Sequence, residues 1–180
     1  MIGAMDPAEQ PITLVPSRGD EWSRRFTVMA ETVRDAVPEA AVEHIGSTAV
    51  PGLAAKDVVD LLVGVAADDV VHVARLLAAA GFDLEGEHGH HCWLSSPGRH
   101  DRDAVVHVVA HDSRSWHNRV AFRDLLRDEE DARRAYLEAK ESAATSARDW
   151  DEYTRAKTSI VMELLARRPL AESAGRDAVR

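Results

Sequence analysis

The sequence predicts a single domain of the α/β or α+β class, in which a mixed sheet flanked by helices precedes a helical C-terminal part. Two observations predict this. Apolar runs typical of strands alternate with helical patterns as far as His111, and only helical periodicity follows. The length of 180 residues also suits one domain with a sizeable core. We expect that domain at residues 9–168, between an expression-vector remnant at 1–8 and a flexible tail at 169–180.

The N-terminal part of the chain predicts an edge strand and a long helix. Residues 12–15 form a short apolar run. The turn that follows contains Ser17 and Asp20, either of which can cap a helix. Apolar residues then recur at helical spacing over residues 20–37, and Pro38 ends the pattern. This first helix is therefore expected to bury one face.

Two strands and a second helix come next. Residues 40–45 lead as a strand into a Gly-Ser turn, and residues 58–65 are almost continuous in Val and Leu. A run of that kind suits a strand that is covered on both faces. Asp68 can cap a helix whose apolar residues recur up to Leu77, and Gly81 stops that helix.

The middle of the chain predicts further strands, and the second half predicts helices. Residues 82–84 and 91–94 are short strand candidates, residues 95–98 form a turn, and residues 104–110 form a strong strand. A helix is expected over residues 116–127. Two further helix faces are marked by Ala132, Tyr136, Ala139 and Ala143, and by Trp150, Tyr153, Lys157, Val161 and Leu164.

The composition limits the classes of partner. A net charge of −9 argues against a broad nucleic-acid surface, although a small nucleotide needs only a few local cations. Cys92 is the only cysteine, so no internal disulfide can form. The sequence contains no apolar run of membrane-spanning length and no signal-peptide pattern. We therefore expect a cytoplasmic protein without a membrane partner.

The turn after the second predicted strand is the clearest candidate site. Gly46 permits a backbone conformation closed to other residues, and Ser47 adds a hydroxyl donor for an anion. Lys56 follows in a Pro-Gly loop, and Asp60 then stands alone in an apolar strand. A carboxylate there is costly unless it is paired or binds a metal. An ordinary turn, and an ion pair between Lys56 and Asp60, are the structural alternatives.

Histidines and helical cations are further candidates. His107 shares a strand face with two valines, where it is either a core residue or a functional one. Arg123 and Lys157 lie near apolar helix stripes and can turn inward toward an anion, whereas a solvated face suits Arg127 better. The tract His88, Gly89, His90, His91 and Cys92 is interpreted as a polar hairpin tip with exposed histidines, since a zinc site needs a second, spaced ligand pair.

Four segments resemble the GrpB family. Residues 44–63 are similar to its hallmark segment, and residues 106–109 to a later strand. Residues 121–127 look like its AFRDYLR-type helix, and residues 153–157 look like its Y-x-x-AK helix. The segments keep the family's order, and the resemblance covers about residues 12–168.

The resemblance implies a nucleotidyltransferase-like fold with its site at the Gly-Ser turn. Active members of that superfamily bind two Mg²⁺ ions through three carboxylates. Asp60 matches the first of these positions, whereas Leu62 and His107 occupy the other two. Glu43, just before the turn, is the candidate for a second metal ligand.

Three functions remain open from the sequence. The first is Mg²⁺-dependent nucleotidyl transfer from a nucleoside triphosphate to a small, unidentified acceptor. In it Gly46 and Ser47 hold phosphates, Lys56, Arg123 or Lys157 neutralise them, Asp60 binds the metal and His107 orients or deprotonates the acceptor. The second is a regulatory module that binds a nucleotide or another anion without turnover. The third and weakest is a metal-dependent hydrolase built on the histidine tract and His107.

Overall fold

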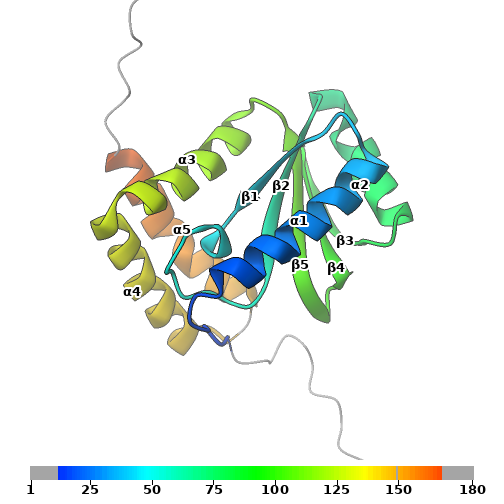
Figure 1. Cartoon of the computed structure of the whole chain (residues 1–180). Helices are drawn as coiled ribbons and strands as arrows, with labels where there is room; N and C mark the ends of the chain where they lie inside the picture. Colours follow the sequence, from blue (N-terminus) through cyan, green and yellow to red (C-terminus); the bar gives the residue numbers. More distant parts are fainter. Residues whose placement is uncertain (1–11, 149, 168–180) are drawn as a thin grey trace, which may run out of the picture.

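The computed structural model describes residues 12–148 and 150–167, and its centre is a five-stranded mixed sheet (Figure 1). The expected vector remnant at 1–8 lies outside the described residues, as does the expected tail at 169–180. The strand order across the sheet is β1-β2-β5-β4-β3. The strands are β1 (Ala41–Ile45), β2 (Val59–Val65), β3 (Asp83–His88), β4 (His91–Gly98) and β5 (Asp101–Ala110).

The two central strands, β2 and β5, are parallel, and every other pairing in the sheet is antiparallel. In the parallel pair Asp60 is opposite Val105, and Leu62 is opposite His107. Because side chains alternate along a strand, Asp60, Leu62 and His107 all point to the same face of the sheet. The predicted mixed sheet with flanking helices is therefore confirmed, and its register brings two of the candidate site residues onto one face.

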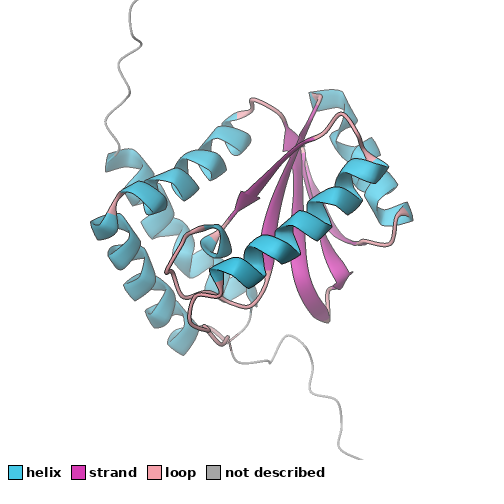
Figure 2. Ribbon diagram, viewed as in Figure 1, coloured by secondary structure: helices cyan, strands magenta, loops and turns pink. Residues whose placement is uncertain are grey.

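The helices form two groups on either side of the sheet (Figure 2). α1 and α2 cover one face of the sheet, and α3, α4 and α5 form a group beside β1. Among the described residues, no helix is long and apolar enough to cross a membrane. The helices are α1 (Gly19–Ala36), α2 (Val70–Ala79), α3 (Arg114–Asp128), α4 (Glu130–Ser146) and α5 (Trp150–Arg167), with short 3₁₀ turns η2 (Ser47–Ala49) and η3 (Ala67–Asp69).

The core consists of three clusters. The largest lies between the sheet and the pair α1 and α2, where Trp22 and Leu61 are fully buried. A second cluster joins α3, α4 and α5 to the loop after η2, and it includes Leu53 and Leu126. A smaller third cluster packs Trp116 of α3 against the other face of the sheet. The loop between η2 and β2 is thus held by the C-terminal helices as well as by the sheet.

Several local predictions were wrong in their bounds. The stretch 95–98, predicted as a turn, continues β4 to Gly98, because its residues pair with β5 through a register shift next to Pro97. Residues 12–15 make only an isolated bridge between Val15 and Ala55. Asp68 lies inside η3, and Asp69 occupies the N-cap of α2 without a side-chain hydrogen bond. In the first two cases, pairing with distant residues decided the boundary.

Candidate functional site

The turn between β1 and η2 lies directly against the β2 carboxylate. Gly46 has a φ of 71° and a ψ of −172°, a conformation that practically only glycine adopts. A Cβ added to Gly46 would lie 2.2 Å from Asp60 Oδ2. Both the backbone angle and the missing side chain are therefore needed for the turn to approach Asp60. The sequence pattern placed these two residues at one site, and the structure brings them into contact.

A cavity of about 640 Å³ opens at this turn. It lies between the sheet and the C-terminal helices, and residues from both line it. Of the predicted site residues, six line the cavity, and these are Gly46, Ser47, Lys56, Asp60, His107 and Lys157.

Three lysines from three separate elements converge on one end of the cavity. Lys56 comes from the loop before β2, Lys140 from α4 and Lys157 from α5. The ammonium groups of Lys56 and Lys157 lie 4.6 and 4.1 Å from the centre of the Tyr153 ring. Lys140 is 1% exposed, donates a hydrogen bond to the Ala54 carbonyl, and lies 5.5 Å from the centre of the Tyr136 ring. The aromatic rings stabilise part of this clustered positive charge.

The positive charges of these lysines repel one another. Burial, together with repulsion from the neighbouring lysine charges, lowers the pKa of Lys56 to about 6 and that of Lys140 to about 7. Burial lowers the pKa of Lys157 to about 8. The Asp60 carboxylate acts in the opposite direction on all three. A bound anion would add to that effect and favour the protonated amines.

Asp60 is kept ionised by its neighbours. Burial opposes its ionisation, but the nearby imidazole and the lysine charges outweigh burial and lower the pKa of the carboxyl. His107 Nε2 lies 3.9 Å from Asp60 Oδ1. On its other side His107 Nδ1 is 3.0 Å from His91 Nε2, and burial lowers the pKa of His91 to about 3. His91 is therefore a neutral partner that orients the His107 ring toward Asp60.

The donor set does not fit the two-metal site that the resemblance implies. In the ranges 12–148 and 150–167, no group of three His, Cys, Asp or Glu side chains is placed to hold a metal ion. Leu62 occupies the next position on the Asp60 face and is fully buried. The other acidic residue that lines the cavity, Glu85, binds Arg102. Because Mg²⁺ prefers several oxygen ligands, the single carboxylate of Asp60 is a poor protein site for it.

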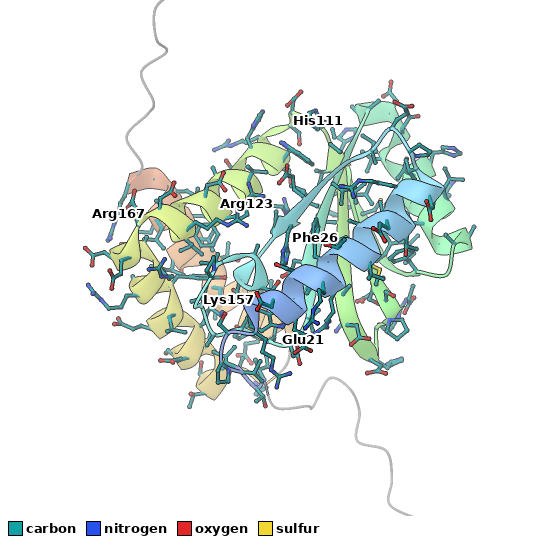
Figure 3. The ribbon with its side chains drawn as sticks, in the orientation of Figure 1. Glu21, Phe26, His111, Arg123, Lys157 and Arg167 are labelled. Carbon is teal, nitrogen blue, oxygen red and sulfur yellow. The ribbon has the colours of Figure 1, made fainter. Side chains whose placement is uncertain are left out.

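The structure does not bring Arg123 or Glu43 into the cavity. Arg123 Nη1 donates to Glu43 Oε2 at 2.6 Å, and Arg123 Nε donates to Asp124 at 2.7 Å. Figure 3 shows Arg123 and Lys157 at separate places on the C-terminal helices. The pair Arg123–Glu43 thus links α3 to β1. His44, beside Glu43, does not line the cavity either, and its ring stacks on Phe26 of α1.

The histidine tract is divided between the two faces of β4. Cys92 is fully buried on the α1 and α2 side, whereas His91 points into the cavity. His88 and His90 are exposed as the hairpin-tip interpretation predicts, but His91 is not, because it pairs with His107. The tract offers no shared metal site for a hydrolase.

Sequence reasoning missed several residues that line the cavity. Arg119, one turn before Arg123 on α3, lines it instead of Arg123, and burial lowers the pKa of its guanidinium. Tyr136 was expected only as part of a helix face, but it lines the cavity as well. Burial raises the pKa of Tyr136 to about 12, so it stays a neutral phenol. Lysine and tyrosine on otherwise small-residue helix faces, as at Lys140, were the available signal.

Comparisons with known proteins agree with the sequence resemblance. The family model described as GrpB protein matches residues 11–167. A UPF0157 protein of Deinococcus radiodurans is 44% identical over 146 residues, which cover 81% of this chain and 77% of the relative. The UPF0157 protein BH1888 of Halalkalibacterium halodurans is 32% identical, over 92% of this chain and 87% of the relative.

One solved structure gives the same result. The crystal structure of the conserved protein GrpB from Enterococcus faecalis overlaps with a TM-score of 0.71 at 28% identity, covering 86% of this chain and 98% of that one. A cytoplasmic RNA terminal U-transferase overlaps with a TM-score of only 0.43 at 13% identity, over 71% of this chain and 43% of that one. At that level nothing about activity follows. The match to the family model, which spans all of the described residues, shows that the chain belongs to the GrpB family.

Proposed function

We propose that the cavity binds the polyphosphate chain of a nucleoside triphosphate, and that the protein acts as a nucleotide-binding module. The observation that carries this proposal is the convergence of Lys56, Lys140 and Lys157 on one end of the cavity. Asp60 is the acidic residue nearest the Gly46 turn in the same cavity. Clustered amines with lowered pKa values gain most from a ligand that carries several negative charges.

The turn beside the lysines supports the same ligand. Ser47 and Tyr136 both line the cavity, so two hydroxyl groups are available there. Gly46 lets the backbone of the turn lie directly against Asp60. The family resemblance implies a phosphate site at this turn, and the cationic surroundings suit one.

Calorimetric titration tests the proposal. Each of the four common nucleoside triphosphates, and inorganic tripolyphosphate, is titrated into the protein with and without MgCl₂. Lys157→Met should weaken binding roughly 10- to 100-fold, the worth of a charge-assisted contact. Arg134→Met is the matched control, because Arg134 is an exposed α4 cation paired with Asp131 outside the cavity. Absence of binding by every ligand, or equal effects of the two variants, would overturn the proposal.

Nucleotidyl transfer is the second candidate, and the closeness of Asp60 to His107 favours it. An ionised carboxylate near an imidazole can assist proton removal from an acceptor hydroxyl in the same cavity. The test is pyrophosphate release from each nucleoside triphosphate with a panel of small hydroxyl and amine acceptors, with and without divalent metal. Asp60→Asn should abolish any release while the protein stays folded. Release that is unchanged in Asp60→Asn would rule out this candidate.

A further inference from the structure

The sheet side of the cavity carries an aromatic surface that the triphosphate site does not use. Trp93 of β4 lines the cavity, and its ring lies 5.4 Å from the His91 ring. The His91 ring in turn lies 5.2 Å from that of His107 on β5. Three rings therefore form a row from Trp93 to the residue beside Asp60.

The position of the indole depends on a glycine in the neighbouring strand. Gly86 is opposite Trp93 in the β3–β4 register. A Cβ added to Gly86 would lie 2.0 Å from the Trp93 ring. The indole thus lies flat over the β3 backbone, and its remaining surface lines the cavity and is only partly buried. Any residue other than glycine at position 86 would place a Cβ where the indole ring lies.

An ion pair lies on the same side of the cavity. Glu85 and Arg102 both line it, and they bind one another through Arg102 Nε and Nη2. Each residue lies at an irregularity of strand pairing. Glu85 falls between Leu84 and Gly86, where the register of β3 with β4 shifts. Arg102 is opposite Pro97, where the register of β4 with β5 shifts. The irregularities turn both side chains toward the cavity. They offer a carboxylate acceptor and guanidinium donors side by side.

This aromatic surface is not explained by packing in the domain core. α2 is the helix that packs closely on β3 and β4, and it lies on the opposite face, where Cys92 and Leu94 point. On the cavity side, α3 makes its close sheet contacts with β1 and β5. Among the described elements, no helix packs closely on the Trp93 side of β3 and β4, so the cavity remains open over the indole.

We propose that Trp93, with the Glu85–Arg102 pair beside it, forms a nucleobase site in which the indole stacks on the base and the ion pair meets its hydrogen-bonding edge. Stacking needs only a flat ring, and paired acceptor and donor groups suit the polar edge of a base. The inference rests on the proposed function for its neighbour, the phosphate end of the same cavity. The base belongs either to the nucleotide held by the lysines or to a second nucleotide beside it.

Titrations with parts of the ligand separate these two sources. The probes are tripolyphosphate, the four nucleosides, and the four nucleoside triphosphates, each titrated into wild type, Trp93→Leu and Trp93→Phe. If the base belongs to the same ligand, a triphosphate binds more tightly than tripolyphosphate. Trp93→Leu should then weaken the triphosphate about 5- to 150-fold, the range of one base–aromatic stack, and leave tripolyphosphate unchanged. If the base belongs to a second nucleotide, a nucleoside binds to protein saturated with tripolyphosphate, and Trp93→Leu removes that binding.

Two further variants keep the test independent of folding. Trp93→Phe retains a stacking ring and should retain most of the affinity for the base. Gly86→Ala keeps the indole but displaces it, and should weaken the same ligands as Trp93→Leu does. Unchanged affinities for every nucleoside and triphosphate in Trp93→Leu would overturn the inference. If instead tripolyphosphate fails to bind while nucleosides bind through Trp93, the phosphate proposal fails and the base site stands.

Discussion

The close approach of Gly46 to Asp60 predicts a large loss of stability in Gly46→Ala. The backbone angles at Gly46 would cost an alanine about 1–3 kcal/mol. The added Cβ would also lie 2.2 Å from Asp60 Oδ2, and overpacking of this kind costs about 1–3 kcal/mol more. We therefore expect the free energy of unfolding to fall by about 2–6 kcal/mol, given the two contributions.

Urea unfolding followed by circular dichroism measures this loss, and two variants separate its causes. Gly52→Ala serves as the control, because Gly52 also has a positive φ of 76° but no atom within 4 Å of its added Cβ. It should cost about 1–2 kcal/mol. In the Asp60→Ala background, Gly46→Ala should lose its collision and cost less than in wild type. The reasoning is refuted if Gly46→Ala costs no more than Gly52→Ala, or if the Asp60→Ala background leaves its cost unchanged.

Three other predictions concern the helices, the loop and the lysines. Leu126→Ala should reduce the free energy of unfolding by about 2–5 kcal/mol in urea melts, because Leu126 is fully buried in the cluster between the C-terminal helices and the loop. Burial opposes ionisation of Asp57, but its hydrogen bonds to Trp22 and Arg25 outweigh burial and hold its pKa below 3.8. The difference in unfolding free energy between wild type and Asp57→Asn should therefore be present above about pH 4 and shrink as the pH falls through the lowered pKa of the folded state. Melts between pH 2 and 7 would measure it, and a difference that stays constant contradicts the prediction. Triphosphate affinity should fall as the pH rises from about 7.5 to 9, because Lys157, with a pKa of about 8, loses its proton while the terminal phosphate, with a pKa of about 6, stays ionised. Calorimetry on Lys157→Met should show a flatter profile.

Local sequence signals predicted the parts of the fold that depend on local chemistry. The Val-rich run of β2 and the amphipathic pattern of α1 were both located to within one residue at each end. The pairing of Gly46 with Asp60 was predictable as well, since a turn and the following strand lie close in sequence. The extent of β4 was not, because Pro97 suggests a turn and only the pairing with β5 extends the strand past it.

The cationic wall of the cavity could be predicted only in part. Arg119 and Arg123 are one helical turn apart, so spacing alone cannot tell which of them faces the sheet. The choice depends on Glu43, which binds Arg123 from a strand 80 positions away. Lys140 stands among small residues of its helix, but its burial depends on the Ala54 carbonyl, 86 positions away. Contacts between residues so far apart in the sequence cannot be recognised from the spacing of residues along one helix or strand.

The loop between η2 and β2 is fixed from four directions. Val15 pairs with Ala55 through two backbone hydrogen bonds, and Lys140 donates to the neighbouring carbonyl. Arg127 Nε donates to the Ala49 carbonyl at 2.9 Å, and Asp57 is bound by the arginines of α1 and the segment before it. For the proposed phosphate ligand, a loop braced in this way would need little ordering, so little entropy would be lost on association. Its amide at Ala55 should exchange with solvent as slowly as those of the sheet, and a phosphate chain would meet a rigid receptor instead of folding one around itself.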